Sequence, residues 1–149
     1  MWFRKQFPPK GELVLKEAWV VKHGKYCGRP VIVRLNRGVE SALGHPAYSH
    51  QVGVALPLRH PDDRGFPNPT ENEALGQIED DLVAALCNEN RCIYAAAIST
   101  GGMREFVFYT SDAEATHRDL ERLRALITSH DVQHVIQEDP KWNVYREFA

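Results

Sequence analysis

Hydrophobic and polar residues alternate in two stretches near the start of the chain, a pattern typical of β-strands. The first stretch covers residues 12–22 and the second covers 29–36, and a turn signal lies between them at residues 23–25. We therefore predict an N-terminal β-hairpin over residues 12–36.

After residue 50 the spacing of hydrophobic residues changes from the two-residue period of a strand to the 3.6-residue period of a helix, and then back. Residues 51–58 alternate, and we expect strand pairing to stop near Pro57 because proline lacks the ladder donor. A helix is predicted over 71–87, from a Thr70–Glu73 capping box onward. Its apolar stripe consists of Leu75, Ile78, Leu82 and Leu86.

The next segment repeats this order. Residues 91–99 and 105–109 predict two strands joined by a Gly101-Gly102 turn. Ser111 and Glu114 form a second capping-box pattern, which predicts a helix as far as about Ser129. A closing strand follows, with Val132, Val135 and Ile136.

This order of elements predicts an α+β fold. Over residues 50–138 we expect a ferredoxin-like βαββαβ antiparallel sheet with two helices on one face. The hairpin would be added to it, together with a short C-terminal helix that Asp139 caps and Pro140 begins. The predicted organisation is a single domain, 1–149, with an N-terminal arm at 1–11 and a tail at 139–149.

Composition excludes several classes of protein. With 149 residues, 43% of them hydrophobic and 26% charged, the chain has enough apolar side chains for a folded core. The net charge of −2 gives no general attraction to nucleic acid, so a nucleic-acid partner is not expected. The sequence contains no stretch of about 20 apolar residues, so no membrane-spanning helix is predicted. Three irregularly spaced cysteines favour free thiols and a cytoplasmic location.

Motifs for catalysis or for a cofactor are not found. The residues His45, His50, His60, Asp62 and Asp63 lack paired zinc-ligand spacing, which favours surface loop histidines over a metal site. For Cys87 and Cys92 we expect packing rather than redox chemistry. No serine lies in a nucleophile elbow, and the glycines do not form a phosphate loop. We predict no catalytic residue, no metal and no cofactor.

Two groups of side chains allow both a structural and a functional interpretation. Glu79, Asp80 and Asp81 predict a solvated helix face, and a basic partner protein could dock against it. The four aromatic residues of the central strands could stack on RNA bases, but packing in the core is the stronger interpretation. These four are Tyr94, Phe106, Phe108 and Tyr109.

Three phrases of the sequence are similar to a known family. They are Gly65-Phe66-Pro67 with the helix segment 75–80, then 102–109, then 138–145. With these phrases the chain resembles the bacterial DUF695 domain over about residues 12–148, a family without an assigned activity. It is more loosely similar to the regulator of ribonuclease activity B family, although it lacks the acidic run of that family. The looser resemblance implies a ferredoxin-like fold that binds and inhibits ribonuclease E without catalysis.

The shared phrases also predict contacts. Arg104 and Glu105 point to opposite sides of a strand, so Arg104 would meet Glu79 or Asp80 while Glu105 would meet the tail or the hairpin. Trp142 and Tyr145 share one face of the tail helix, where they would seal a sheet edge or the end of the core. A binding rim is the alternative role for this pair.

We expect a non-catalytic protein-binding or regulatory module, and the looser family resemblance implies a nuclease regulator. Its exposed sheet edges would also allow a homodimer. The candidate binding residues are Arg59, Arg64, Glu79, Asp80, Arg104, Trp142 and Tyr145. The alternative is a small-molecule binder or enzyme with its pocket between the sheet and the loops 37–49 and 59–69.

Overall fold

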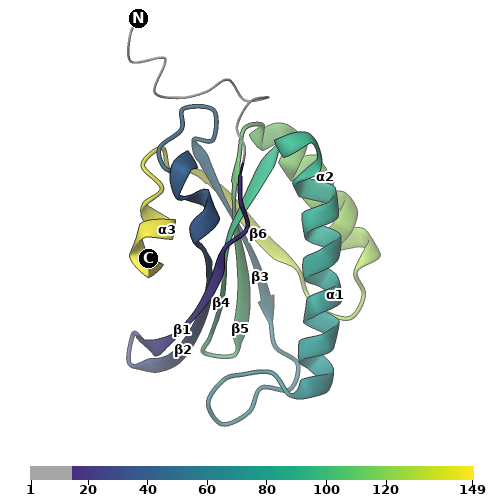
Figure 1. Ribbon diagram of the computed structural model, residues 1–149. Coiled ribbons are helices and arrows are strands. Elements are labelled where there is room, and N and C mark those ends of the chain that lie inside the picture. Colours follow the sequence, from purple (N-terminus) through teal and green to yellow (C-terminus); the bar gives the residue numbers. More distant parts are fainter. Residues whose placement is uncertain (1–14) are drawn as a thin grey trace, which may run out of the picture.

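In the described part of the chain, six strands form one antiparallel sheet in the order β1-β2-β4-β5-β3-β6 (Figure 1). The computed structural model describes residues 15–149, so the predicted arm and the first residues of the hairpin lie outside the described residues. The strands are Trp19–Tyr26 (β1), Arg29–Asn36 (β2), His50–Pro57 (β3), Cys92–Thr100 (β4), Met103–Thr110 (β5) and Gln133–Glu138 (β6).

Helices cover the sheet on both faces, which confirms the α+β class. Helices α1 (Pro69–Leu86) and α2 (Ala113–Leu126) lie on one face. The short helix α3 (Asn143–Phe148) and the 3-10 helix η3 (Arg37–Ala42) lie on the other (Figure 1). A 3-10 turn, η4 (Asn88–Asn90), follows α1. None of the helices in the described part of the chain is both long and apolar enough to cross a membrane.

The sheet therefore separates two hydrophobic cores. The core under α1 and α2 includes Val52, Val54, Leu56, Leu75, Leu82, Phe106, Phe108 and Leu120. The core under η3 and α3 includes Val33, Leu35, Val39, Tyr48, Ile93, Tyr109, Trp142 and Tyr145. Alternation along the central strands β3 and β5 sends successive side chains to opposite faces of the sheet, whereas a bulge in β4 places both Ala95 and Ala96 in the core under η3 and α3. The predicted stripe of α1 is confirmed, and so is the end of β3 pairing at Pro57, which lies opposite Met103.

The predicted turn of the N-terminal hairpin is wrong by about three residues. Strand β1 continues through Gly24 to Tyr26, and the chain reverses at Cys27 and Gly28, whose φ angles are +52° and +78°. Two successive positive φ angles are typical of the type I′ turn, which matches the twist of the strands. Strand β2 also pairs with β4, so the hairpin extends the main sheet.

Both predicted helix caps are displaced. Asn68 caps α1, because its Oδ1 accepts from the N–H of Glu71 (2.7 Å) and Pro69 occupies the first helical position. Asp112 caps α2 through Ala115 N (3.0 Å), while the Ser111 hydroxyl donates to the carbonyl of Arg91 (3.1 Å). A capping pattern in sequence identifies a helix start only to within a residue or two.

The tail forms its helix later than predicted. Trp142 rather than Asp139 is the N-cap of α3. The Asp139 carboxylate nevertheless accepts from the first backbone N–H groups of the helix, those of Asn143 (2.8 Å) and Val144 (3.0 Å). Trp142 and Tyr145 are 0% and 1% exposed. They belong to the core on the sheet face rather than to a binding rim.

Candidate ligand-binding groove

A hollow lies where the sheet extends beyond α1. Helix α1 does not cover the β1–β2 end of the sheet, and a cavity of about 410 Å³ remains between them. Its lining is Val21, Ile32, Arg34, Phe66, Pro67, Asn72, Gly76, Glu79, Ser99 and Arg104. A second hollow of about 370 Å³, lined in part by Trp19, Asp80 and Tyr94, shares Arg34 and Glu79 with the first. We call the two together the Arg104 groove.

Gly76 keeps the helix wall of the groove open. A Cβ atom built on Gly76 would meet no atom within 4 Å. Glycine inside a helix costs about 1 kcal/mol relative to alanine, and no backbone conformation requires it here, because its φ is not positive. The residue thus leaves space beside the sheet at some cost to helix stability.

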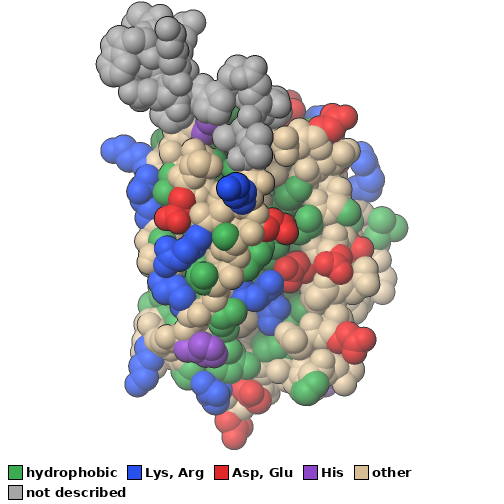
Figure 2. Space-filling model, in the orientation of Figure 1, with side chains coloured by type: hydrophobic (Ala, Val, Ile, Leu, Met, Phe, Trp, Pro, Cys, Tyr) green, Lys and Arg blue, Asp and Glu red, His purple; other side chains and the backbone are tan. Residues whose placement is uncertain are grey.

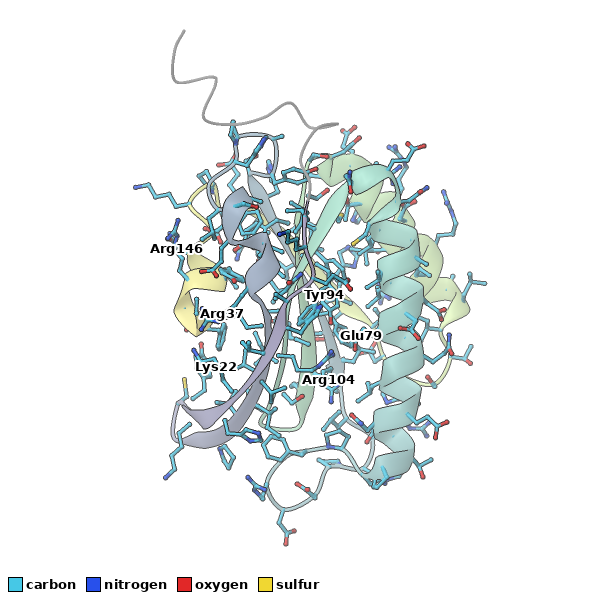
Figure 3. The ribbon with its side chains drawn as sticks, viewed as in Figure 1. Lys22, Arg37, Glu79, Tyr94, Arg104 and Arg146 are labelled. Carbon is cyan, nitrogen blue, oxygen red and sulfur yellow. The ribbon has the colours of Figure 1, made fainter. Side chains whose placement is uncertain are left out.

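Glu79 is the central carboxylate of the groove (Figure 3). It accepts from Arg34 Nη2 at 2.6 Å and from the Tyr94 hydroxyl at 3.0 Å. Its side chain is 18% exposed, so the prediction of a water-covered residue is wrong for Glu79. The reason is that β1 and β2 continue the sheet alongside α1, so that Arg34 of β2 reaches this side of the helix. Asp80 is exposed, as predicted, at the rim.

Arg104 lies deeper in the same groove (Figure 3) and is 9% exposed. Its Nε donates to Ser99 Oγ (2.6 Å) and its Nη2 donates to Asn72 Oδ1 (3.0 Å). No carboxylate of residues 15–149 lies within ion-pair distance of it, so the expected pair with Glu79 or Asp80 is not formed. Burial and the nearby charge of Arg34 lower the pKa of Arg104.

These groups can bind an anion that carries an apolar body. In the hollow at Arg104, two guanidinium groups face one half-buried carboxylate, that of Glu79, which leaves an excess positive charge there. The carboxylates of Glu17 and Asp80 line the second hollow. A guanidinium has five N–H donors, and the contacts above use two of those on Arg104. Ile32, Phe66 and Pro67 supply apolar surface. Acidic side chains lie over α1 and basic ones predominate over the β1–β2 side (Figure 2).

The groove brings together only part of the predicted set. Glu79 and Arg104 line it and Asp80 lies at its rim. Arg59 instead donates from Nη1 to the carbonyl of Ser129 (3.2 Å), and Arg64 lies over the ring of Phe66, 5.0 Å from its centre. Glu105 faces the opposite side from Arg104, as predicted, and burial and then Glu147 raise its pKa.

Sequence reasoning missed the residues that position Arg104. Ser99 and Asn72 are small polar residues without a motif around them. Arg34 was detectable in principle, because it is the charged residue on the face of β2 opposite Val31, Val33 and Leu35. Gly76 was a second signal, since glycine is unfavourable inside a helix.

Two of the loop residues considered for a metal, His45 and Asp62, have structural roles of their own. His45 is 4% exposed, so it is not a surface histidine, and its Nδ1 accepts from Ala47 N (3.0 Å). Asp62 accepts from the backbone N–H groups of Arg64 and Phe66, at 2.9 Å each. Packing of the strand aromatics in the cores is confirmed for Phe106, Phe108 and Tyr109.

The fold and the groove define an α+β domain whose antiparallel sheet has a charged hollow beside helix α1. The chain belongs to DUF695, a family of unknown function, whose sequence profile matches residues 17–149. The resemblance found in the three phrases is thereby confirmed. No curated protein shows significant similarity to the chain.

Proposed function

We propose that this protein is a non-catalytic binding domain that takes an acidic segment of a partner protein in the Arg104 groove. One observation supports this above all: the guanidinium of Arg104 is buried and its hydrogen-bond partners, Ser99 and Asn72, are neutral. A buried charge is costly unless it is paired. A carboxylate or phosphate of a ligand would pair with it and could accept two parallel hydrogen bonds.

The shape of the groove favours a chain segment over a compact metabolite. The two hollows continue along α1 from Arg104 to Trp19, and both are open to solvent. Val21, 57% exposed on β1, offers an apolar contact along this path. Asp80 at the rim would attract a basic residue of the same segment. A regulator of another enzyme, such as a nuclease, would act through this kind of contact.

Two further assignments accompany the proposal. The order β6-β3-β5-β4, antiparallel throughout and with α1 and α2 on one face, supports a ferredoxin-like core to which β1 and β2 are added. The free thiols of Cys27, Cys87 and Cys92 support residence in a reducing compartment, the cytoplasm.

NMR titration of the ¹⁵N-labelled full chain tests the groove. The probe is an acetylated pentapeptide with one central glutamate between leucines, and its matched control carries glutamine. We expect saturable shifts of the Arg104 Nε–H and the Asn72 side-chain amide with the glutamate peptide alone. Equal shifts with both peptides would contradict the proposal.

Variants assign the effect to one side chain. Arg104→Gln should abolish the shifts of the remaining groove signals, and Arg104→Lys should weaken binding because lysine cannot form the bidentate contact. Arg122→Gln is the matched control, because Arg122 is 73% exposed on α2. Binding that survives Arg104→Gln would overturn the proposal.

A small-molecule ligand is the second candidate, because the hollow at Arg104 alone has about 410 Å³ and pockets of this size hold small ligands. Phe66 and Pro67 of the 59–69 loop line it, whereas Val39 and Ala42 of the 37–49 loop pack on the other face. Titration with succinate and with inorganic phosphate separates the candidates. Binding of these anions without binding of the glutamate peptide would favour the second candidate.

A further inference from the structure

Three metal-binding side chains converge at the opposite edge of the sheet from the Arg104 groove. His117 and Glu121 lie one turn apart on α2, so their side chains share a face of the helix. His134 lies on the edge strand β6, at an inward position between Val132 and Ile136. The donor atoms of the three residues all lie within 4.8 Å of one another.

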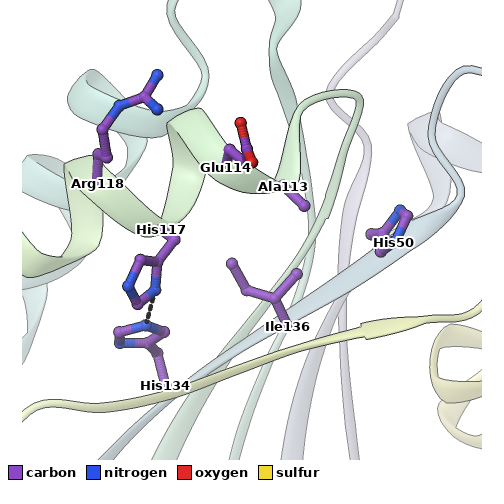
Figure 4. Close-up of a pocket in the computed structure, with 7 residues that line it drawn as sticks. All are labelled: His50, Ala113, Glu114, His117, Arg118, His134 and Ile136. Carbon is purple, nitrogen blue, oxygen red and sulfur yellow. Dashed lines mark hydrogen bonds between the residues drawn. The ribbon is translucent and has the colours of Figure 1, made fainter.

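The two imidazole rings face each other across the gap between α2 and β6 (Figure 4). His117 Nδ1 and His134 Nε2 are 3.1 Å apart, and His134 Nε2 is 3.9 Å from Glu121 Oε1. Tetrahedral zinc binds imidazole nitrogens at about 2.0–2.1 Å, which places two ligand atoms about 3.3 Å apart. The histidine pair thus already has the spacing of two ligands.

Glu121 needs only a small movement to join them. Its side chain is 47% exposed, and its other contact is a long one, 3.9 Å to Arg124 Nη1 on the helix surface. A rotation of this flexible side chain would bring the carboxylate oxygen to ligand distance. His134, in contrast, is 10% exposed and held by the sheet, so it is the fixed member of the group.

We propose that His117, Glu121 and His134 bind a divalent transition-metal ion of the zinc type. Two imidazole nitrogens and one carboxylate oxygen suit zinc and exclude magnesium and calcium, which prefer oxygen ligands alone. A fourth coordination position would face the open depression of about 730 Å³ beside the pair. Bound metal would join α2 to the edge strand.

In the absence of metal, the same histidines form an N–H···N hydrogen bond. That bond requires hydrogen on one of the two facing nitrogens, whereas coordination requires a lone pair on both. Metal binding therefore shifts this hydrogen to the far nitrogen of its own ring. The change of tautomer gives the site a spectroscopic signature of its own.

Sequence reasoning missed this site because it sought histidine pairs. The signal was a His-x-x-x-Glu spacing inside the predicted second helix, residues 117 and 121, together with His134 among the apolar residues of the last strand. Only the packing of α2 against β6 brings the third ligand to the other two.

Zinc titration of the full chain tests the site. The protein is prepared without a histidine tag, treated with chelator and kept reduced, with Cys27→Ser removing the exposed thiol. Calorimetry with zinc chloride should show one ion per chain. His117→Ala and His134→Ala should each weaken binding about tenfold or more, since loss of even an outer-shell partner has this effect.

His50→Ala is the matched control, because His50 lines the far end of the same depression (Figure 4). It should bind zinc like the parent. Long-range ¹H–¹⁵N spectra of the parent give a readout that needs no variant, and zinc should move the ring signals of His117 and His134 but not of His50. The proposal would be overturned if the parent chain did not bind zinc saturably, or if His134→Ala bound zinc as tightly as the parent chain.

Discussion

Glu71 keeps a buried carboxylate at the start of α1, with a side chain only 4% exposed. It accepts from the backbone N–H groups of Arg59 (2.6 Å) and His60 (3.0 Å), and its Oε2 lies 2.7 Å from His130 Nε2. Burial alone would raise the pKa of Glu71, but these hydrogen bonds outweigh burial and lower it. One side chain thus ties the 59–69 loop to the segment that follows α2.

The lowered pKa of Glu71 makes stability depend on pH. The unfolded chain takes up the proton near the ordinary value of 4.5, above the folded pKa, so the stabilisation is complete above this value and is lost as the pH falls below it. Glu71→Gln should lower the free energy of unfolding at pH 7 by about 2 kcal/mol and flatten its fall with acid. Urea unfolding from pH 3 to pH 7 measures both. Glu73→Gln, at an exposed position, should leave the profile unchanged.

Substitutions of Gly76 should change stability and ligand binding separately. Gly76→Ala should raise the free energy of unfolding by about 0.5–1 kcal/mol, because alanine favours the helix and its Cβ meets no atom within 4 Å. Gly76→Leu should be tolerated for the same reason, yet its longer side chain would enter the Arg104 groove and block the glutamate peptide. Thermal unfolding and the NMR titration test the two effects. A lower free energy of unfolding for Gly76→Ala would contradict the conclusion that space is open beside Gly76.

At the scale of elements, α3 depends on contacts with the sheet rather than on its own length. A helix of six residues is not stable alone. Asp139 holds its first turn and also accepts from the Tyr109 hydroxyl of β5 (2.8 Å). Trp142 stacks on Tyr109 with ring centres 3.8 Å apart, and its Nε1 donates to the carbonyl of Tyr48 (2.9 Å).

Removal of the Asp139 carboxylate should allow the C-terminal tail to unfold before the rest of the domain. Asp139→Ala loses charge-assisted hydrogen bonds to three donors, which predicts a loss of about 2–3 kcal/mol. Hydrogen exchange should accelerate first in residues 143–149. Glu138→Ala is the adjacent control at an exposed position. Uniform acceleration throughout the sheet would show instead that α3 unfolds with the whole domain.

At the scale of the whole molecule, the two cores lie on opposite faces of one sheet, so unfolding of the sheet exposes both. The reactivity of the three cysteine thiols reports on this unfolding. Burial and the nearby Cys92 raise the pKa of Cys87 to about 12, and burial also raises that of Cys92, while Cys27 is exposed in the hairpin turn.

Alkylation with iodoacetamide at pH 8 should therefore modify Cys27 alone in the folded protein, since the thiolate is the reactive form. Cys87 and Cys92 should react only as urea unfolds the chain, with the same midpoint as the loss of circular dichroism. Mass spectrometry of the peptides assigns the sites. Reaction of Cys87 in the absence of urea would show that the α1 side of the sheet opens locally.

Local patterns predicted most of the elements and few of the contacts. The stripe Leu75 to Leu86 and the alternation Val52 to Leu56 were correct because each depends on neighbours a few residues away. The hairpin turn was misplaced because Gly24 gives the same signal as a turn glycine although it lies within β1 opposite Val31. The interpretation of Glu79 failed because Arg34, its partner, is 45 residues away in the chain.

The sequence by itself determined the strands, the helices, their order and the family, since these follow from short-range period and from phrases of adjacent residues. The tertiary structure decided which polar groups meet. It placed β1 and β2 beside α1, which formed the Arg104 groove, and it packed α2 against β6, which joined His117 to His134. The physical reason is that such contacts depend on the relative positions of whole elements, which no local pattern of side chains encodes.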